Sequence, residues 1–327
     1  MSPRAVLFGA EEALPALPVC DHYAGVEPRM TKSLQLQAEM GPVFDVTLDN
    51  EDGAPVGGEI DQAHLIVSLL NGPDNRFGRV GVRLLPFGHP RFADVAGIVL
   101  TSLRKPAYLM LPKPESAADV QGAAQAIDAL GGTTIPLHAL VETHGALREV
   151  NAIAAHPRIE SLSFGLMDFV SAHRGAIPAS AMSAKGQFEH PLVLRAKLEI
   201  AAACHAHGKT PSHCVVTEFK HASALMEAAG KACRQFGYTR MWSIHPAQIR
   251  PIVEAFTPTV AEVDQAIEII AAALAADWAP IRHHDTLHDR ASYRYFWHLL
   301  ERAHRTSYAG GSQLPAEVRE AYFGHAV

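Results

Sequence analysis

Cysteine is scarce in this chain, and the sequence has neither an excess of basic residues nor a long apolar run. The 327 residues include four cysteines without a CxxC pair, a pattern typical of reduced thiols in a cytosolic protein. No apolar run approaches the roughly 18 residues of a membrane span, and the N-terminus lacks the apolar stretch of a signal peptide. The 28 basic and 34 acidic residues give a formal net charge of −6. We therefore expect a cytoplasmic protein that binds neither membrane nor nucleic acid.

Several catalytic motifs are also missing. No GxGxxG follows the first predicted strand, and the chain contains neither a GxSxG elbow nor HExxH. The segment HGKT at 207–210 resembles the end of a P-loop, but Ala203 stands where a P-loop requires its first glycine. These absences argue against dinucleotide-binding proteins, serine hydrolases and P-loop proteins.

Histidine is the residue type in excess, with 19 copies, and it invites a metal or acid–base interpretation. Two groups of residues offer zinc ligands, but neither has the spacing of a structural zinc site, and adjacent histidines on a helix diverge. The two groups are Cys204, His205 and His207, and His283, His284 and His288.

Short β-branched runs alternate with longer amphipathic segments along most of the chain, as expected of buried strands and helices. The predicted strands are 19–23, 44–48, 79–84, 107–111, 137–141, 161–164, 213–216 and 240–244. The predicted helices are 28–40, 58–70, 91–100, 116–130, 144–155, 190–206, 220–236, 246–256 and 260–276. Eight strands alternating with helices predict an α/β fold with parallel pairing, and at this length a (β/α)8 TIM barrel is the expected closure. A doubly wound open sheet is the alternative.

The composition changes near residue 279, where histidine, arginine and aromatic residues become frequent. We therefore predict a TIM-barrel catalytic domain over residues 1–278 and a C-terminal helical extension over 279–327. The apolar residues of the extension recur at helical spacing, at Tyr293, Phe296, Trp297 and Leu300. We expect such an amphipathic helix to pack on its own barrel or on a neighbouring subunit, which predicts an oligomer.

Carboxylates follow three of the predicted strands, where a barrel places its catalytic groups. Asp49, Glu51 and Asp52 follow the second strand, Glu142 follows the fifth, and Asp168 follows the sixth. Glu142 and Asp168 belong to adjacent strands and can converge on one Mg²⁺ ion, which prefers hard oxygen ligands. Alternatively, each carboxylate caps the helix that follows or pairs with a neighbouring base, and the spacing leaves both interpretations open.

Arg83 ends the third strand and supplies the matching cation at the same barrel mouth. Its guanidinium can bind a substrate oxygen and stabilise a developing enolate. The alternative is a purely structural pair with Asp49 or Glu51. Lys113 follows the fourth strand and His245 the eighth, and we expect both to shape or brace the site.

The ordered motifs TLDNEDG, the strand-ending arginine, LPKPE, LVET, FGLMD and SIHPAQI resemble the HpcH/HpaI aldolase/citrate lyase β subunit family over residues 17–276. The resemblance implies a TIM barrel that reversibly cleaves the carbon–carbon bond of a 3-hydroxy acid or its coenzyme A thioester. It implies Mg²⁺ on Glu142 and Asp168, Arg83 on the substrate oxygen, and a bracing cluster of Asp49, Glu51 and Asp52. It also places Lys32 towards coenzyme A and implies a homotrimer or homohexamer.

We expect four residues to line the substrate: Lys32, Lys113, His245 and His22. The general base stays open between a carboxylate of the 49–52 cluster, His22, a metal-bound water and an acid of a neighbour's tail such as Asp289. Arg83 is followed by two leucines where the family usually has Arg-x-Asn, so the substrate stays open. The first strand ends in DHYAG at 21–25, without the Pro-Gly turn common in members that use coenzyme A, so coenzyme A binding stays open as well. A thioesterase on the same scaffold and a non-catalytic binding protein are the alternative functions.

Overall fold

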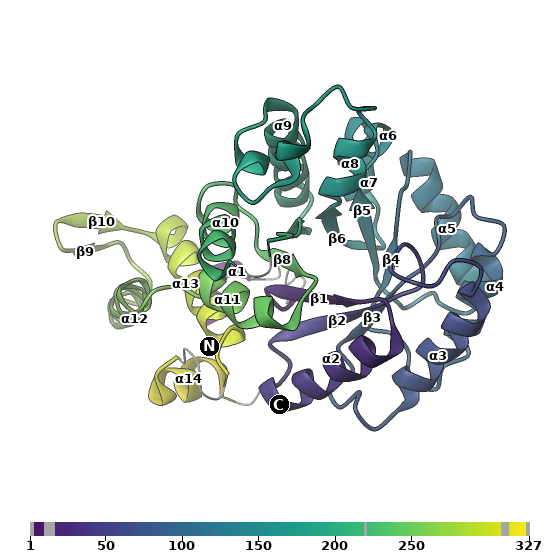
Figure 1. Ribbon diagram of the computed structural model, residues 1–327. Coiled ribbons are helices and arrows are strands. Elements are labelled where there is room, and N and C mark those ends of the chain that lie inside the picture. Colours follow the sequence, from purple (N-terminus) through teal and green to yellow (C-terminus); the bar gives the residue numbers. More distant parts are fainter. Residues whose placement is uncertain (1–2, 10–16, 219–220, 309–313, 325–327) are drawn as a thin grey trace. The chain divides into compact units, whose positions relative to one another are not determined.

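The computed structural model describes residues 3–9, 17–218, 221–308 and 314–324 (Figure 1). Contacts within the chain divide it into two compact units. We call Pro15–Val253 the barrel unit, and Met1–Leu14 together with Glu254–Val327 the terminal unit. Each unit has its own core.

Eight parallel strands close the barrel unit in chain order, which confirms the (β/α)8 prediction and rules out the open sheet (Figure 1). The strands are β1 (Cys20–Ala24), β2 (Phe44–Asp49), β3 (Val80–Arg83), β4 (Leu109–Leu111), β5 (Leu137–Val141), β6 (Ile159–Phe164), β7 (Thr210–His213) and β8 (Arg240–Ser243). Their carboxyl ends meet at one end of the barrel, where TIM barrels carry their sites.

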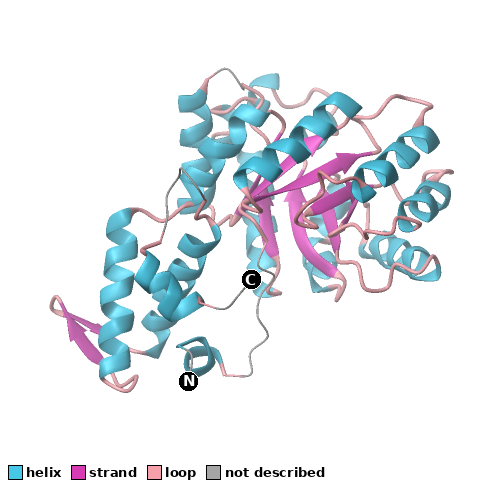
Figure 2. Ribbon diagram, turned by 90° about the horizontal axis from the view of Figure 1, so that it is seen from below, coloured by secondary structure: helices cyan, strands magenta, loops and turns pink. Residues whose placement is uncertain are grey.

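Helices cover the outside of these strands (Figure 2). They are α2 (Glu27–Met40), α3 (Glu59–Asn71), α4 (Phe92–Leu100), α5 (Ala117–Ala129), α6 (His144–Arg148), α7 (Val150–Ala155), α8 (Leu166–Ser171), α9 (Pro191–Ala206), α10 (Ala222–Arg234) and α11 (Pro246–Phe256). Two short 3₁₀ turns, η1 (Ala179–Met182) and η2 (Gly186–Phe188), precede α9. The helix expected over 144–155 is two helices, α6 and α7, separated at Glu149, and α8 was not expected.

The seventh strand lies three residues earlier than the sequence predicted. We expected it over 213–216, whereas β7 begins at Thr210 and includes Pro211, which has no amide hydrogen to donate. In the structure Pro211 pairs with Leu162 of β6, and its carbonyl accepts a hydrogen bond from the amide of Thr239 at 3.3 Å. One missing donor is therefore tolerated at the start of β7.

A buried polar network fills part of the barrel interior. The fully buried Arg240 lies 2.6 Å from the carboxylate of Asp45 and 3.2 Å from that of Asp21. The hydroxyl of Tyr108 donates to Asp21 at 3.0 Å. Gly81 has no side chain because a Cβ there would lie 2.2 Å from the Tyr108 ring. The paired charges meet the requirement that buried ions be compensated.

The terminal unit consists of α1 (Pro3–Phe8), α12 (Val260–Ala275), the hairpin β9 (Ile281–His283) and β10 (Thr286–His288), α13 (Arg290–Arg305) and α14 (Ala316–Phe323). The apolar face of α13 packs on α12, with Phe296 and Trp297 in one cluster with Ile269 and Ile270. This packing groups α12 with the C-terminal helices, and the compact units divide at 253/254. The boundary of the catalytic domain, expected at 278/279, stays a prediction.

Polar groups finish the ends of the terminal-unit elements. Thr259 and Glu262 form a capping box at the start of α12, and Asp289 caps α13. His283 and His284 face Glu268, with ring Nε2 atoms 3.0 and 3.8 Å from its carboxylate. Over the residues that the structure describes, no helix is both long and apolar enough to cross a membrane.

Candidate active site

The charged residues predicted from the sequence gather at the carboxyl end of the barrel. Asp49 ends β2 and Arg83 ends β3, and the pairing of these strands sets the two residues side by side. Lys113 follows β4, Glu142 directly follows β5, and Asp168 lies in the first turn of α8 after β6. Five consecutive strands of the barrel therefore contribute to one cluster.

Arg83 and Asp49 form a buried bidentate ion pair. The Nε and Nη2 atoms of Arg83 lie 2.7 and 2.9 Å from the two carboxylate oxygens of Asp49. The backbone amides of Glu51 and Gly53 also donate to Asp49, at 2.9 and 2.6 Å, and hold the turn after β2. Gly53 has to be glycine, because a Cβ there would lie 2.3 Å from an Asp49 oxygen. Asp49 therefore fixes the position of Arg83.

The structural pairing of Arg83 with Asp49 and Glu51 is present, but the guanidinium still has N–H groups with which it can bind a ligand. Two of its five N–H donors are hydrogen-bonded to Asp49, and Nη1 lies 2.9 Å from Glu51 as an ion pair without hydrogen-bond geometry. Its central carbon lies 4.6 Å above the ring of Tyr23, which stacks on Trp242 with ring centroids 5.2 Å apart. The sequence interpretation missed Tyr23 and Trp242, whose only signal is their position near strand ends.

Lys113 joins the acidic turn after β2 to the acids of β5 and α8. Its Nζ lies 2.5 Å from Glu51, 2.6 Å from Asp52 and 3.8 Å from Asp168. Its backbone amide donates to Glu142 at 3.0 Å. The residue has a left-handed backbone, with φ of 49°, which is unusual outside glycine. This conformation lets one residue offer its amide to Glu142 and its ammonium to the other three acids.

Glu142 is a buried carboxylate that lies near a second acid, Asp168. Burial raises its pKa well above the usual value, and the nearby charge of Asp168 raises it further. Gly165 lies so close that a Cβ there would be 2.3 Å from a Glu142 oxygen. Asp168, with its side chain 43% exposed, faces solvent more than Glu142 does. Two such carboxylates are a donor set that fits a hard divalent cation such as Mg²⁺.

A pocket of about 390 Å³ opens over these carboxylates. Lys113, Glu142 and Asp168 line it together with residues of the β4–α5 loop and of α6 and α8. We call it the acidic pocket. Its size is that of a site for a small molecule.

Lys113, Glu142 and Asp168 are the predicted residues that line the acidic pocket. Arg83 and the acids at 49, 51 and 52 are not part of its lining, and neither are His22, His245 and Lys32. His22 hydrogen bonds through Nδ1 to Ser243 at 3.0 Å, and it points to the opposite face of β1 from Tyr23. Burial, with a smaller effect of His245, lowers the pKa of His22 to about 4. His245 is exposed before α11, where its Nδ1 accepts a hydrogen bond from the amide of Ala247. Lys32 is exposed on α2.

A closed parallel barrel with carboxylates and one bound arginine at its carboxyl end defines a TIM-barrel protein with a cation-competent acidic site. The family model described as HpcH/HpaI aldolase/citrate lyase matches residues 41–246. The chain belongs to this family, which confirms the resemblance inferred from the motifs.

Three similar proteins illustrate the family's range. A crystal structure of a citrate lyase from Burkholderia xenovorans is 53% identical, with a TM-score of 0.82 and coverage of 95% of this chain and 98% of that one. A (3S)-malyl-CoA thioesterase of Cereibacter sphaeroides is 30% identical over 74% of this chain and 79% of its own. An L-malyl-CoA/beta-methylmalyl-CoA lyase of the same species is 27% identical over 71% and 77%.

Proposed function

We propose that this protein is a Mg²⁺-dependent carbon–carbon lyase that cleaves a 3-hydroxy acid or its coenzyme A thioester. The observation that carries the proposal is the buried Glu142 beside Asp168 and Lys113, at the same barrel end as the fixed guanidinium of Arg83. Relatives named as lyases support the same reaction class.

Glu142 and Asp168 are the residues that would hold Mg²⁺ in this proposal. When bound, the ion supplies positive charge next to the substrate oxygen on which negative charge develops. The rest of the reaction depends on the chain's own residues.

Arg83 binds the oxygen that becomes the enolate. Over the described residues, three of its five N–H groups are not hydrogen-bonded to Asp49 or Glu51, and they can donate to that oxygen. In a retro-aldol cleavage the hydroxyl loses its proton, its carbon becomes a carbonyl, and the electrons of the broken carbon–carbon bond move to the enolate. A fixed cation stabilises that charge most in the transition state, because no reorganisation is needed at the moment of reaction.

Asp52 is our candidate for the group that accepts the hydroxyl proton. Asp49 is engaged at both oxygens by Arg83, and Glu51 lies between Arg83 and Lys113. Asp52 is bound to Lys113 through Oδ2, and its side chain is 56% exposed. Although partial burial opposes it, the hydrogen bond from Lys113 lowers the pKa of Asp52, so the group is ionised at neutral pH.

The remaining sequence expectations join this proposal. The barrel over residues 1–278 would carry catalysis, and the segment 279–327 would contact a neighbouring subunit. We propose a cytoplasmic oligomer in which Lys32 and His245 face the part of the substrate farthest from Mg²⁺, and in which coenzyme A, where present, lies towards Lys32.

The test uses the full chain with a panel of 3-hydroxyacyl-CoA thioesters and 4-hydroxy-2-oxo acids, with and without Mg²⁺. We expect Mg²⁺-dependent retro-aldol products, lost on chelation and in Glu142→Gln. Glu199→Gln is the matched control, because Glu199 pairs with Arg195 on the surface of α9. Free coenzyme A released without carbon–carbon cleavage would identify a thioesterase instead. No turnover, with no Mg²⁺ binding by calorimetry, would leave a binding protein.

A further inference from the structure

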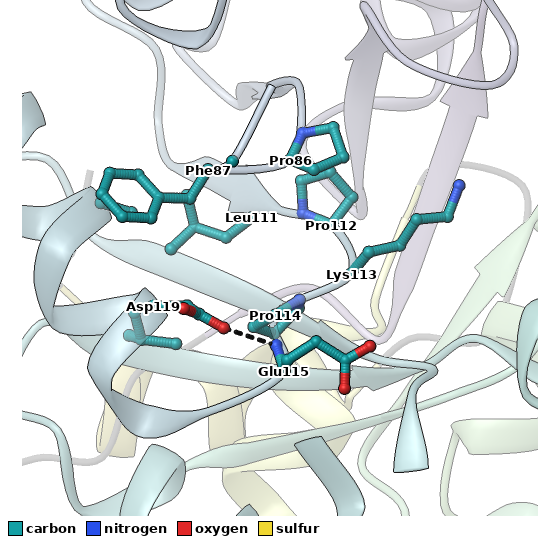
Figure 3. Close-up of a pocket in the computed structure, with 11 residues that line it drawn as sticks. Pro86, Phe87, Leu111, Pro112, Lys113, Pro114, Glu115 and Asp119 are labelled. Carbon is teal, nitrogen blue, oxygen red and sulfur yellow. Dashed lines mark hydrogen bonds between the residues drawn. The ribbon is translucent and has the colours of Figure 1, made fainter. Parts of the chain in front are cut away.

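A second pocket lies beside the acidic pocket, between the β3–α4 loop and α5. Its volume is about 410 Å³, and it is lined by residues 86–88, residues 111–115 and three residues of α5 (Figure 3). We call it the rim pocket. We propose that it binds an uncharged hydrocarbon group of the substrate, so that the natural substrate is a 3-hydroxy acid or acyl group with an apolar chain. This inference rests on the proposed function.

The rim pocket adjoins the acidic pocket. Lys113 and Glu115 line both of them. In Figure 3 the Lys113 side chain extends away from Phe87 and Leu111, and its ammonium is held by Glu51 and Asp52. A ligand whose polar head lies at Glu142 can therefore place its tail in the rim pocket.

The lining is apolar where a ligand would touch it. The side chains of Phe87, Leu111 and Val120 line the pocket together with three prolines. The ammonium of Lys113 is paired with Glu51 and Asp52. The carboxylate of Asp119 accepts a hydrogen bond from the backbone amide of Glu115 at 2.8 Å (Figure 3). These groups suit a hydrocarbon chain, because burying an unpaired polar group costs free energy whereas burying methylenes lowers it.

The same lining does not suit the phosphates of coenzyme A. Its cationic residue is neutralised, and Glu115 and Asp119 would repel a polyphosphate. Lys32, the residue that resemblance places towards coenzyme A, lies on α2 after β1, whereas the rim pocket lies over β3 and β4. We therefore assign the pocket to the acyl chain.

Phe87 forms one wall of the rim pocket, and its ring packs against α5 at Gly122. A Cβ on Gly122, within α5, would lie 2.7 Å from the Phe87 ring. The ring also contacts Phe92 edge-on, with centroids 5.4 Å apart. Glycine inside a helix destabilises it, so a packing reason for Gly122 is expected. The Phe87 ring, which occupies the space of a side chain at 122, is such a reason.

The experiment measures binding of 3-hydroxybutyrate, 3-hydroxyhexanoate and 3-hydroxyoctanoate to the full chain with Mg²⁺, by calorimetry. We expect affinity to rise about fourfold per added methylene. Phe87→Ser removes the aromatic wall of the pocket. It should reduce the ratio of the affinity for the eight-carbon acid to that for the four-carbon acid at least tenfold. Phe77→Ser is the matched control, because Phe77 and Phe87 are both 40% exposed and Phe77 precedes β3, away from the pocket. It should leave that ratio unchanged.

Each other outcome decides between the two proposals. Equal affinity for the three acids, or equal effects of the two variants, would overturn the rim-pocket assignment. Weaker binding of free coenzyme A to Phe87→Ser would also overturn it, since the pocket would then hold the cofactor end. A rising affinity without any cleavage would reject the lyase while the assignment stands. Cleavage of short substrates without rising affinity would do the reverse.

Discussion

At the scale of single residues, Arg83 differs from most surface cations because two acids hold its guanidinium at a fixed place. Bidentate binding to Asp49 requires a planar group with parallel N–H donors, which lysine lacks. We expect Arg83→Lys to lower kcat by roughly 10²–10³-fold, the typical loss of one donor to a developing oxyanion. Steady-state kinetics measure this loss, and calorimetry should find Mg²⁺ affinity almost unchanged.

The control for this prediction is Arg79→Lys. Arg79 also forms a bidentate pair, with Asp45 at 2.7 and 2.9 Å, but it precedes the other end of β3. It should cost stability without a comparable loss of kcat. Equal losses in the two variants would mean that Arg83 only supports the fold.

Lys197 is another buried cation, besides Arg83 and Arg240, and the sequence patterns did not predict it. Its Nζ lies 2.7 Å from the Gln187 side-chain oxygen, 2.6 Å from Nε2 of His213 and 3.7 Å from the centroid of the Phe188 ring. Burial lowers its pKa from 10.5 to about 8. Between these values the unfolded chain binds a proton that the folded protein has released, so stability rises with pH.

We therefore expect the free energy of unfolding of the wild type, minus that of Lys197→Met, to rise by about 2 kcal/mol between pH 7.5 and 9.5. Urea unfolding at the two pH values measures it. Lys185→Met is the control, because the Lys185 side chain is 81% exposed. The free energy of unfolding of the wild type minus that of Lys185→Met should be the same at both pH values. A difference that is flat or falls for Lys197→Met would contradict the lowered pKa.

At the scale of elements, the turn from β6 into α8 places Glu142 through the absence of a side chain at Gly165. A methyl group there would displace the Glu142 carboxylate, from which it would lie 2.3 Å. We expect Gly165→Ala to weaken Mg²⁺ binding at least tenfold and to lower stability by about 1–3 kcal/mol. Calorimetry and denaturant unfolding measure the two effects.

Gly97→Ala tests whether any added methyl group would do the same. Gly97 lies in α4, and its Cβ would make only an ordinary contact, 3.8 Å from Leu130. Alanine favours a helix, so this variant should be slightly more stable and bind Mg²⁺ normally. Mg²⁺ binding by Gly165→Ala as tight as in the wild type would show that Glu142 does not depend on the turn.

Local patterns were enough to predict most elements, because each barrel strand is a buried run and each helix has one apolar face. They failed where tertiary contacts decide. Glu149 interrupts the helix expected over 144–155, and its carboxylate binds the amide of Ala117 at the start of α5. Pro211 forms part of β7 because its neighbours need only its carbonyl on that side. Neither partner can be identified from nearby sequence.

At the scale of the whole molecule, the charged cluster was predictable because parallel strands all bring their carboxyl ends to one place. Strand order alone therefore gathers Asp49, Arg83, Lys113, Glu142 and Asp168. It does not fix side-chain direction, so the outward position of His22 and the ring of Tyr23 beneath Arg83 could not be predicted. The interior pair of Arg240 with Asp21 and Asp45 likewise depends on which residues face inward.

The oligomer stays a prediction, but a different surface now supports it. The apolar face of α13, for which we expected a barrel or a neighbouring subunit as cover, packs on α12 within the terminal unit. Other apolar side chains of this unit are exposed, among them Leu287 at 72% and Tyr295 at 61%. Burial of such groups between subunits would stabilise an oligomer.

We therefore expect light scattering of the full chain to give three or six times the 35.2 kDa chain mass. Lysine at both exposed positions, Leu287→Lys with Tyr295→Lys, should lower the mass because two charges would have to be buried in the interface. Leu103→Lys, at a position 90% exposed in the barrel unit, is the control and should keep the wild-type mass. A mass near 35 kDa for the wild type would reject the oligomer. A wild-type mass kept by the double variant would place the interface elsewhere on the chain.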